Sequence, residues 1–382
     1  MIESLNKKVS AYCGLNLAFY KTGEASQTAE IIKDLLPLSK IAVLSTIDTD
    51  LQFINELKYA LLKYGVKPIC VFLKSAPLLD VNAVLDLFLL PEDVRGVIVV
   101  NKSICKIAEY FSYVRKTPCF YFLYDELPTD LVFEYLCLKN GGCIDVIKKD
   151  FDRKIILSKS FINNFTAKDA LEHFAVILSI VVDTCVKSEA KKIDCQMVIN
   201  QILEKIETCI DDVFSNAESG DYALNAVLDV ETDLMSLGRE WSLNAISAIS
   251  FLVGKDCAVY NTMSTAYSIL EVYKTKLSFK VDFTFLNYAE RAKLVSYYAG
   301  IDCCECIKSI KEQAQIFSAL KESDFDYSRR VIEEVNGIYG KISNYCKLKK
   351  KNQIDEQIIL LAGDTPLGVN GMSLLREKSP LN

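Results

Sequence analysis

The hydrophobic period of this chain changes near residue 155, and that change constrains the fold more than any other feature. Before it, short β-branched runs alternate with stretches whose apolar residues recur at helical spacing. The run 40–46, the helical pattern 50–64, Gly65 and the run 67–72 together predict a strand–helix–strand unit. Near-continuous apolar strands joined by helices are typical of a parallel sheet that is covered on both faces.

The same order of elements recurs further along, with predicted strands at 95–100 and 118–123 around a helix at 103–114. After residue 161 the pattern consists of long helical segments, at 167–187, 199–214, 222–253, 266–274, 288–299, 303–320 and 329–347. We therefore predict an α/β N-terminal domain with a Rossmann-like parallel sheet over residues 1–158, and an all-α C-terminal domain over residues 159–382. A ligand-binding cleft is expected at the junction, because pockets favour such places.

Composition excludes several classes of function. The chain carries 44 Lys and Arg against 50 Asp and Glu, a net charge of −6, so neither nucleic acid nor an anionic membrane is expected as its main partner. No apolar run approaches the ~20 residues that a membrane helix requires. Most of the 14 cysteines are scattered, and the start shows no charged-then-apolar signal segment. These features predict reduced thiols in a cytoplasmic protein.

The densest cysteine group consists of Cys303, Cys304 and Cys306. Adjacent cysteines cannot easily face one tetrahedral ion from a helix, and no second cluster closes such a site. We interpret them as core or incidental thiols and leave their role open.

Two local motifs carry the candidate chemistry. In the first, the strand ending at residue 100 runs directly into Asn101, Lys102 and Ser103, and Lys106 follows in the next helix. Taken alone, this segment is an ordinary turn between a strand and a helix. The second motif places Asp169 and His173, the only histidine of the chain, at i and i+4 on one helix face. A carboxylate and an imidazole so spaced can bind one metal ion.

The layout and these motifs resemble the superfamily that contains 3-dehydroquinate synthase, glycerol dehydrogenase, glycerol-1-phosphate dehydrogenase and the iron-containing alcohol dehydrogenases. The resemblance runs from about residue 13 to residue 345. It implies a nucleotide-binding-like sheet domain and a metal-binding-like helical domain. For an active member it further implies NAD(P) beside Asn101, Lys102, Ser103 and Lys106. It also implies a divalent metal (zinc, iron or nickel) at Asp169 and His173.

The phosphate turn departs from the family pattern. The family turn, Gly-Gly-Gly-Ser-x-x-Asp-x-x-Lys, lets the cofactor pyrophosphate approach the backbone because its glycines lack Cβ atoms. Here Val100, Asn101 and Lys102 replace the small residues, while Lys106 and Glu109 reverse the charges of the family aspartate and lysine. We therefore predict weak or absent dinucleotide affinity.

The metal site departs from the family pattern as well. The family uses two further histidines, and the segments that should hold them, 258–271 and 276–287, contain none; Phe279 stands at one of these positions. Catalytic metal sites usually keep three protein ligands, so one carboxylate and one imidazole predict an inherited site that is empty. A hydrogen bond between Asp169 and His173 is the simplest alternative use of the pair. Without a metal ion, hydride transfer has no electrophile.

Two functional hypotheses follow. The first is a catalytically degenerate member of the superfamily with a binding or regulatory role and no cofactor, acting on a small molecule in the interdomain cleft or on a protein partner. The alternative is an active NAD(P)- and metal-dependent polyol or glycerol-phosphate dehydrogenase with a divergent site. The loss of two independent requirements favours the first. A resemblance limited to the fold, with an unrelated substrate, is a third interpretation. A homo-oligomer is compatible with each.

Overall fold

The computed structural model describes residues 2–11, 17–74, 84–124, 126–128, 135–140, 143–216, 219–237 and 326–345. The chain groups into two compact units. The sheet unit comprises Met1–Leu138, Val146–Ala170 and Asp212–Ser236, and the second unit comprises Lys139–Asp145, Leu171–Asp211 and Leu237–Asn382. The expected domain limits, 1–158 and 159–382, stay a prediction, and the grouping adds segments that follow residue 158 to the sheet unit.

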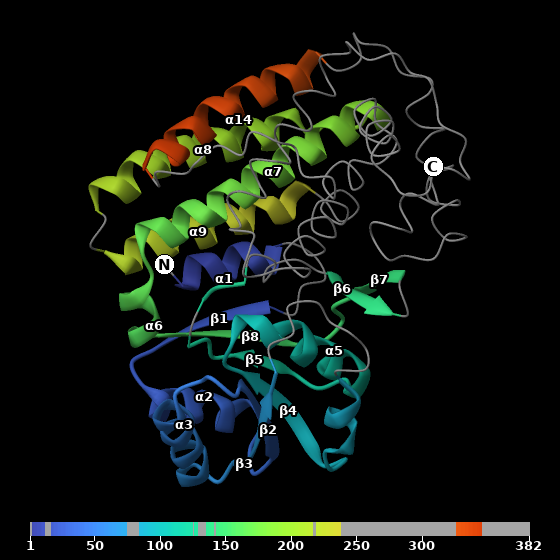
Figure 1. Cartoon of the computed structure of the whole chain (residues 1–382), viewed down its shortest axis with the longest axis vertical. Coiled ribbons are helices and arrows are strands. Elements are labelled where there is room, and N and C mark those ends of the chain that lie inside the picture. Colours follow the sequence, from blue (N-terminus) through green and yellow to red (C-terminus); the bar gives the residue numbers. More distant parts are fainter. Residues whose placement is uncertain are drawn as a thin grey trace, which may run out of the picture. The chain divides into compact units, whose positions relative to one another are not determined.

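A parallel sheet of six strands forms the centre of the sheet unit (Figure 1). Its strands are β1 (Leu17–Thr22), β2 (Lys40–Thr46), β3 (Lys67–Leu73), β4 (Val94–Val99), β5 (Cys119–Tyr121) and β8 (Arg153–Ser158). They lie in the order β1-β8-β5-β4-β2-β3, and the neighbouring strands pair in parallel. A separate two-stranded sheet pairs β6 (Tyr135–Asn140) with β7 (Cys143–Lys148). The predicted parallel α/β sheet is confirmed.

Helices cover both faces of this sheet (Figure 1). On one face, α2 (Ala25–Leu35) and α3 (Leu51–Lys63) pack against alternate residues of the strands. That core contains Ile32, Ile41, Leu57, Ile98 and Phe120, each fully buried. Successive side chains of a strand point to opposite faces. The strand residues that do not face α2 and α3 therefore face α5 (Cys105–Arg115). Both faces are buried, which explains the near-continuous apolar runs of the sequence.

Short connections set the direction of each helix. The side chain of Asp50 caps α3 by accepting a hydrogen bond from the Gln52 N–H at 2.9 Å. Gly65 follows α3 with φ of 80°, a left-handed conformation that glycine adopts without strain. Before β4 lies the 3₁₀ turn η1 (Leu85–Leu89), and between β4 and α5 lies the turn η2 (Lys102–Ile104).

The rest of the described chain is helical. It forms α6 (Lys159–Asn164), α7 (Ala167–Lys191), α8 (Gln196–Ser215), α9 (Gly220–Leu234), the turn η3 (Met235–Leu237) and α14 (Asp326–Tyr345). These helices confirm the helical pattern predicted near 167–187, 199–214 and 329–347. The helix predicted at 222–253 is shorter than expected, because α9 ends at Leu234 and η3 follows, and residues 238–253 lie outside the described ranges. The helices predicted at 266–274, 288–299 and 303–320 lie outside the described residues, as do Cys303, Cys304 and Cys306. No helix in the described ranges is long and apolar enough to cross a bilayer.

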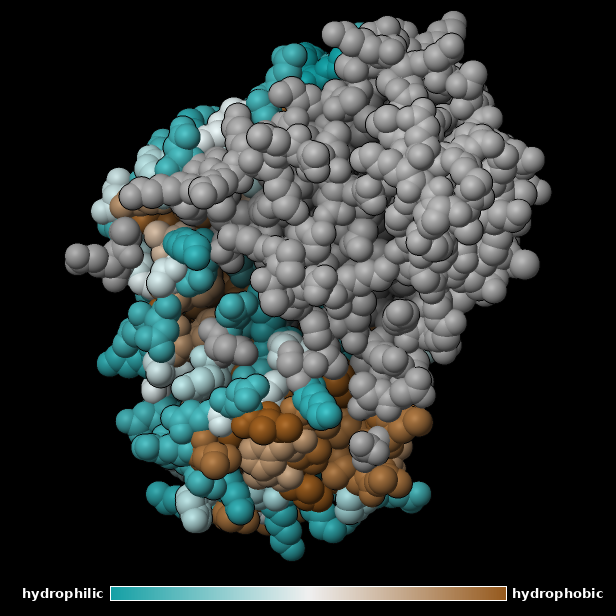
Figure 2. Space-filling model, in the orientation of Figure 1, coloured by the Kyte–Doolittle hydropathy of each residue, from teal (hydrophilic) through white to brown (hydrophobic). Residues whose placement is uncertain are grey.

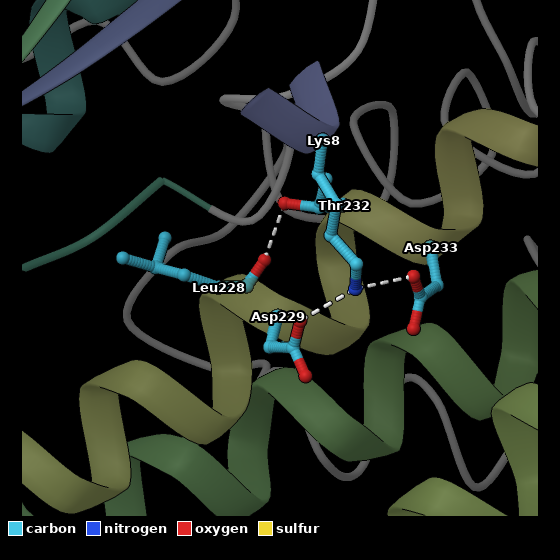
Figure 3. A network of polar contacts seen from close by, with 5 residues as sticks. All are labelled: Lys8, Leu228, Asp229, Thr232 and Asp233. Atoms are coloured by element: carbon cyan, nitrogen blue, oxygen red, sulfur yellow. Dashed lines mark hydrogen bonds and ion pairs between the residues drawn. The ribbon is translucent and has the colours of Figure 1, made fainter. Parts of the chain in front are cut away.

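Within the sheet unit, α1 (Ile2–Ala11) is held to α9 by charge (Figure 3). The Lys8 ammonium lies between two carboxylates one helical turn apart, 2.5 Å from Asp229 Oδ1 and 2.7 Å from Asp233 Oδ1. Within α9, the Thr232 hydroxyl donates a hydrogen bond to the Leu228 carbonyl at 2.6 Å. The amino-terminal helix is thereby joined to a segment more than 200 residues away in the sequence.

Candidate functional site

The first candidate site lies at the carboxyl ends of β2 and β4. From β2 the chain proceeds to β3 on one side, and from β4 it proceeds to β5 on the other. In open α/β sheets, ligands bind outside the carboxyl ends of the strands where the order reverses in this way. Asn101, Lys102, Ser103 and Lys106 follow β4, so the sheet places the predicted cofactor residues at this edge.

Asn101 is bonded across this edge rather than open to it. Its side chain is buried, and its Oδ1 accepts hydrogen bonds from the Thr46 backbone N–H at 2.9 Å and from the Thr49 hydroxyl at 2.7 Å. Thr46 and Thr49 also bond to each other through their hydroxyls at 3.0 Å. The end of β2 is therefore fastened to the end of β4, where a pyrophosphate would need free backbone N–H groups.

The other three cofactor candidates form one turn beside Asn101. The Lys102 ammonium lies 2.8 Å from Glu126 Oε2, an exposed ion pair within the sheet unit. Ser103 and Lys106 are both half-buried, in η2 and in the first turn of α5. The charge that Lys102 could offer a phosphate is thus already balanced by a neighbouring carboxylate.

Aromatic side chains that the sequence reasoning missed lie beside this turn. Phe53 of α3 stacks on Phe122 with 5.3 Å between ring centroids, and its ring meets that of Tyr124 at a tilt of 43° with 4.8 Å between centroids. The Tyr124 N–H donates to the Val100 carbonyl at 2.8 Å, which holds this residue at the end of β4. Tyr124 is 43% exposed, so part of this residue is available to a ligand. Nothing local in the sequence pairs residue 53 with residue 124.

Glu109, the residue at the position of the family lysine, points into the core. Its Oε1 accepts hydrogen bonds from the Tyr121 hydroxyl at 2.5 Å and from the Lys149 ammonium at 2.6 Å. The side chains of Glu109 and Lys149 are 3% and 0% exposed. Burial is the main cause that raises the pKa of Tyr121, and the nearby Cys119 and Glu109 raise it further. The Glu109 carboxylate, which stands at the position of the family lysine, therefore forms a buried ion pair with Lys149.

The described residues at this edge do not fit a dinucleotide. Val100 is fully buried, and Asn101 uses its carbonyl oxygen within the protein. The glycine cradle through which a pyrophosphate reaches the backbone is missing.

The second candidate site is the start of α7, which carries both predicted metal residues. Asp169 Oδ2 accepts hydrogen bonds from the Thr166 N–H at 2.8 Å and from the Thr166 hydroxyl at 2.7 Å, while the Asp169 N–H donates to the Thr166 hydroxyl oxygen at 3.2 Å. His173 lies one turn further along the helix and is 5% exposed. The structure thus gives the Asp169 carboxylate the partner Thr166, and the predicted hydrogen bond to His173 stays a prediction.

The described residues do not fit a catalytic metal ion at this place either. Across the described ranges, no three His, Cys, Asp or Glu side chains are arranged to hold one ion. Phe279 and the segments that should carry the family histidines lie outside those ranges.

Comparison with known proteins identifies the fold. No family model matches this sequence, and no curated protein matches it by sequence. Among solved structures, an archaeal halo-thermophilic alcohol dehydrogenase from a Red Sea brine pool superposes with a TM-score of 0.57 at 11% identity, covering 95% of this chain and 96% of that one. Maleylacetate reductase from Agrobacterium tumefaciens gives 0.55 at 11% identity, covering 94% and 95%.

Glycerol dehydrogenase from Schizosaccharomyces pombe superposes with a TM-score of 0.51 at 12% identity, covering 88% of this chain and 93% of that one. At such identities the likeness concerns the fold. This chain has the fold shared by iron-containing alcohol dehydrogenases and glycerol dehydrogenase, as the resemblance in the sequence predicted.

Proposed function

We propose that this chain is a catalytically degenerate member of the superfamily that contains the iron-containing alcohol dehydrogenases and glycerol dehydrogenase, and that it acts by binding, as a partner or regulatory protein. The proposal rests mainly on the hydrogen bonds that the Asn101 side chain accepts. Its Oδ1 is 2.9 Å from the Thr46 nitrogen and 2.7 Å from the Thr49 hydroxyl, at the edge where a dinucleotide would have to approach.

The charges around this edge support the same proposal. An active member would direct positive charge toward the cofactor phosphates. Here Lys102 is paired with Glu126, and the carboxylate of Glu109 replaces the family lysine and is used by Lys149. Recovering a phosphate site would require breaking the exposed Lys102–Glu126 pair and the buried Glu109–Lys149 pair as well as removing side chains. Breaking a buried ion pair by losing one partner costs about 3–5 kcal/mol.

The surface of the sheet unit suggests two kinds of partner. The exposed part of Tyr124 offers a contact for a planar group of a small molecule. Figure 2 shows apolar residues gathered over the sheet unit on the face turned to the viewer, and Leu38 and Leu89 in this unit are each 84% exposed. Exposed apolar surface of this kind favours contact with a protein partner.

Isothermal titration calorimetry with NADH and NADPH tests the proposal. We expect no saturable heat at sub-millimolar cofactor, because the phosphate approach is filled. Lys102→Ala is the matched control, since it removes a charge without touching the Asn101 bonds. A micromolar complex, about 8 kcal/mol of binding, that weakens in Lys102→Ala would overturn the proposal and favour an active dehydrogenase with a divergent site.

A further inference from the structure

The start of α7 carries a reciprocal pair of hydrogen bonds. Thr166 occupies the position before the helix, and Asp169 is the third residue within it. The hydroxyl oxygen of Thr166 accepts from the Asp169 N–H, and the carboxylate of Asp169 accepts from the Thr166 N–H. This is the capping-box arrangement, in which two backbone N–H groups without helical partners are satisfied at once.

We infer that the aspartate at the family's metal position serves in this chain as the cap of α7, and that Asp169 and His173 do not form a metal site. The inference rests on the proposed function. Side chains of a helix tilt toward its N-terminus, and the capping carboxylate extends one turn in that direction, to residue 166. His173 lies one turn in the opposite direction along the helix. The carboxylate that should face a shared ion is therefore held toward the helix start.

The surroundings give this cap a structural task. Only Phe165 and Thr166 separate the end of α6 from the start of α7. The Phe165 N–H donates to the Phe161 carbonyl at 3.0 Å, which closes α6, and the cap opens α7 directly afterwards. A carboxylate in the first turn is also stabilised by the helix dipole. Asp169 therefore caps the first turn of α7 directly after α6 ends.

A double-mutant cycle with zinc analysis tests the inference. We expect Thr166→Ala and Asp169→Ala each to lower Tm by about 2–4 °C, and the double variant to fall no further than either single one, because both remove the same pair of bonds. Asp169→Asn keeps an oxygen that can accept from the Thr166 N–H, so it should lose less than Asp169→Ala. Thr166→Ser retains the hydroxyl and serves as the control that should stay close to the native Tm.

The zinc content of each variant, purified without chelator and titrated with zinc ions alone, provides the second measurement. If Asp169 serves only as the cap of α7, every variant should contain the same background level of zinc as the native protein. Stoichiometric zinc that disappears in Asp169→Ala and Asp169→Asn but remains in Thr166→Ala would overturn the inference, as would strictly additive losses of Tm. Calorimetry with NADH tests the proposed function separately from the inference about Asp169. Binding of NADH would contradict the proposed function, whatever the Thr166–Asp169 double-mutant cycle shows.

Discussion

Three polar residues at positions where the family motifs face a ligand bond to other residues of this chain. Asn101 joins the ends of β2 and β4, Glu109 pairs with Lys149, and Asp169 bonds to Thr166. The Glu109 pair is the most deeply buried of the three. Two charges removed from water are tolerated only when each satisfies the other, so losing one partner leaves the other uncompensated.

Lys149→Met therefore tests the energetics of this buried pair. The substitution leaves the Glu109 carboxylate without its cation, and we expect it to lower the free energy of unfolding by about 3–5 kcal/mol, measured by urea denaturation. Adding Glu109→Gln should recover most of that loss, since the remaining amide carries no charge. A Lys149→Met variant as stable as the native protein would show that the ion pair contributes nothing to the fold.

At the scale of elements, the amino end of α9 packs directly on the backbone of α6. A Cβ placed on Gly220 would lie 2.1 Å from the Ile162 carbonyl oxygen and 2.5 Å from that of Phe165. Both atoms belong to the backbone, so neither can rotate away as a side chain would. Glycine at this position allows the two helices to approach, and this contact places α9 with the sheet unit.

Gly220→Ala should consequently destabilise the chain by about 1–3 kcal/mol through overpacking. Gly337→Ala in α14 is the matched control, because among the described residues no atom outside its own helix backbone and chain neighbours lies within 4 Å of its Cβ position. There alanine should stabilise by about 0.5–1 kcal/mol through its helix propensity. Thermal unfolding followed by circular dichroism compares the two. Equal effects at both positions would mean that the α6–α9 contact does not depend on the glycine.

At the scale of the whole molecule, charge sets which partners are compatible. The chain carries six more acidic than basic residues. Polyanions bind mainly through neutralisation of their phosphates or sulfates by Lys and Arg, so an acidic protein gains little from them.

We therefore expect the protein to pass through a heparin or DNA column at physiological salt and to bind an anion exchanger. A protein that a basic patch directs to nucleic acid would be retained and would elute as salt rises. Salt-dependent retention on DNA would contradict the expectation that nucleic acid is not a partner, and elution positions on the two columns measure it directly.

The sequence by itself predicted several of the strands and helices. The run 40–46 coincides with β2, and the predicted 103–114 helix corresponds to α5, because periodicity of apolar residues reports which face of a local element is buried. It also located both candidate sites, since a strand followed by a polar turn and an i, i+4 pair are local patterns.

Only the tertiary structure decided what those residues contact. In the sheet, β8 lies between β1 and β5. In the sequence, all the other strands come between β1 and β8. The pairing of Asn101 with Thr46 joins residues 55 apart, and that of Glu109 with Lys149 joins residues 40 apart. Local patterns show that a polar residue lies on a buried face, but its partner is set by the packing of distant elements. In this protein such packing gave internal partners to Asn101 and Glu109 at the positions that resemble a cofactor site, whereas Asp169 at the metal-like position bonds locally to Thr166.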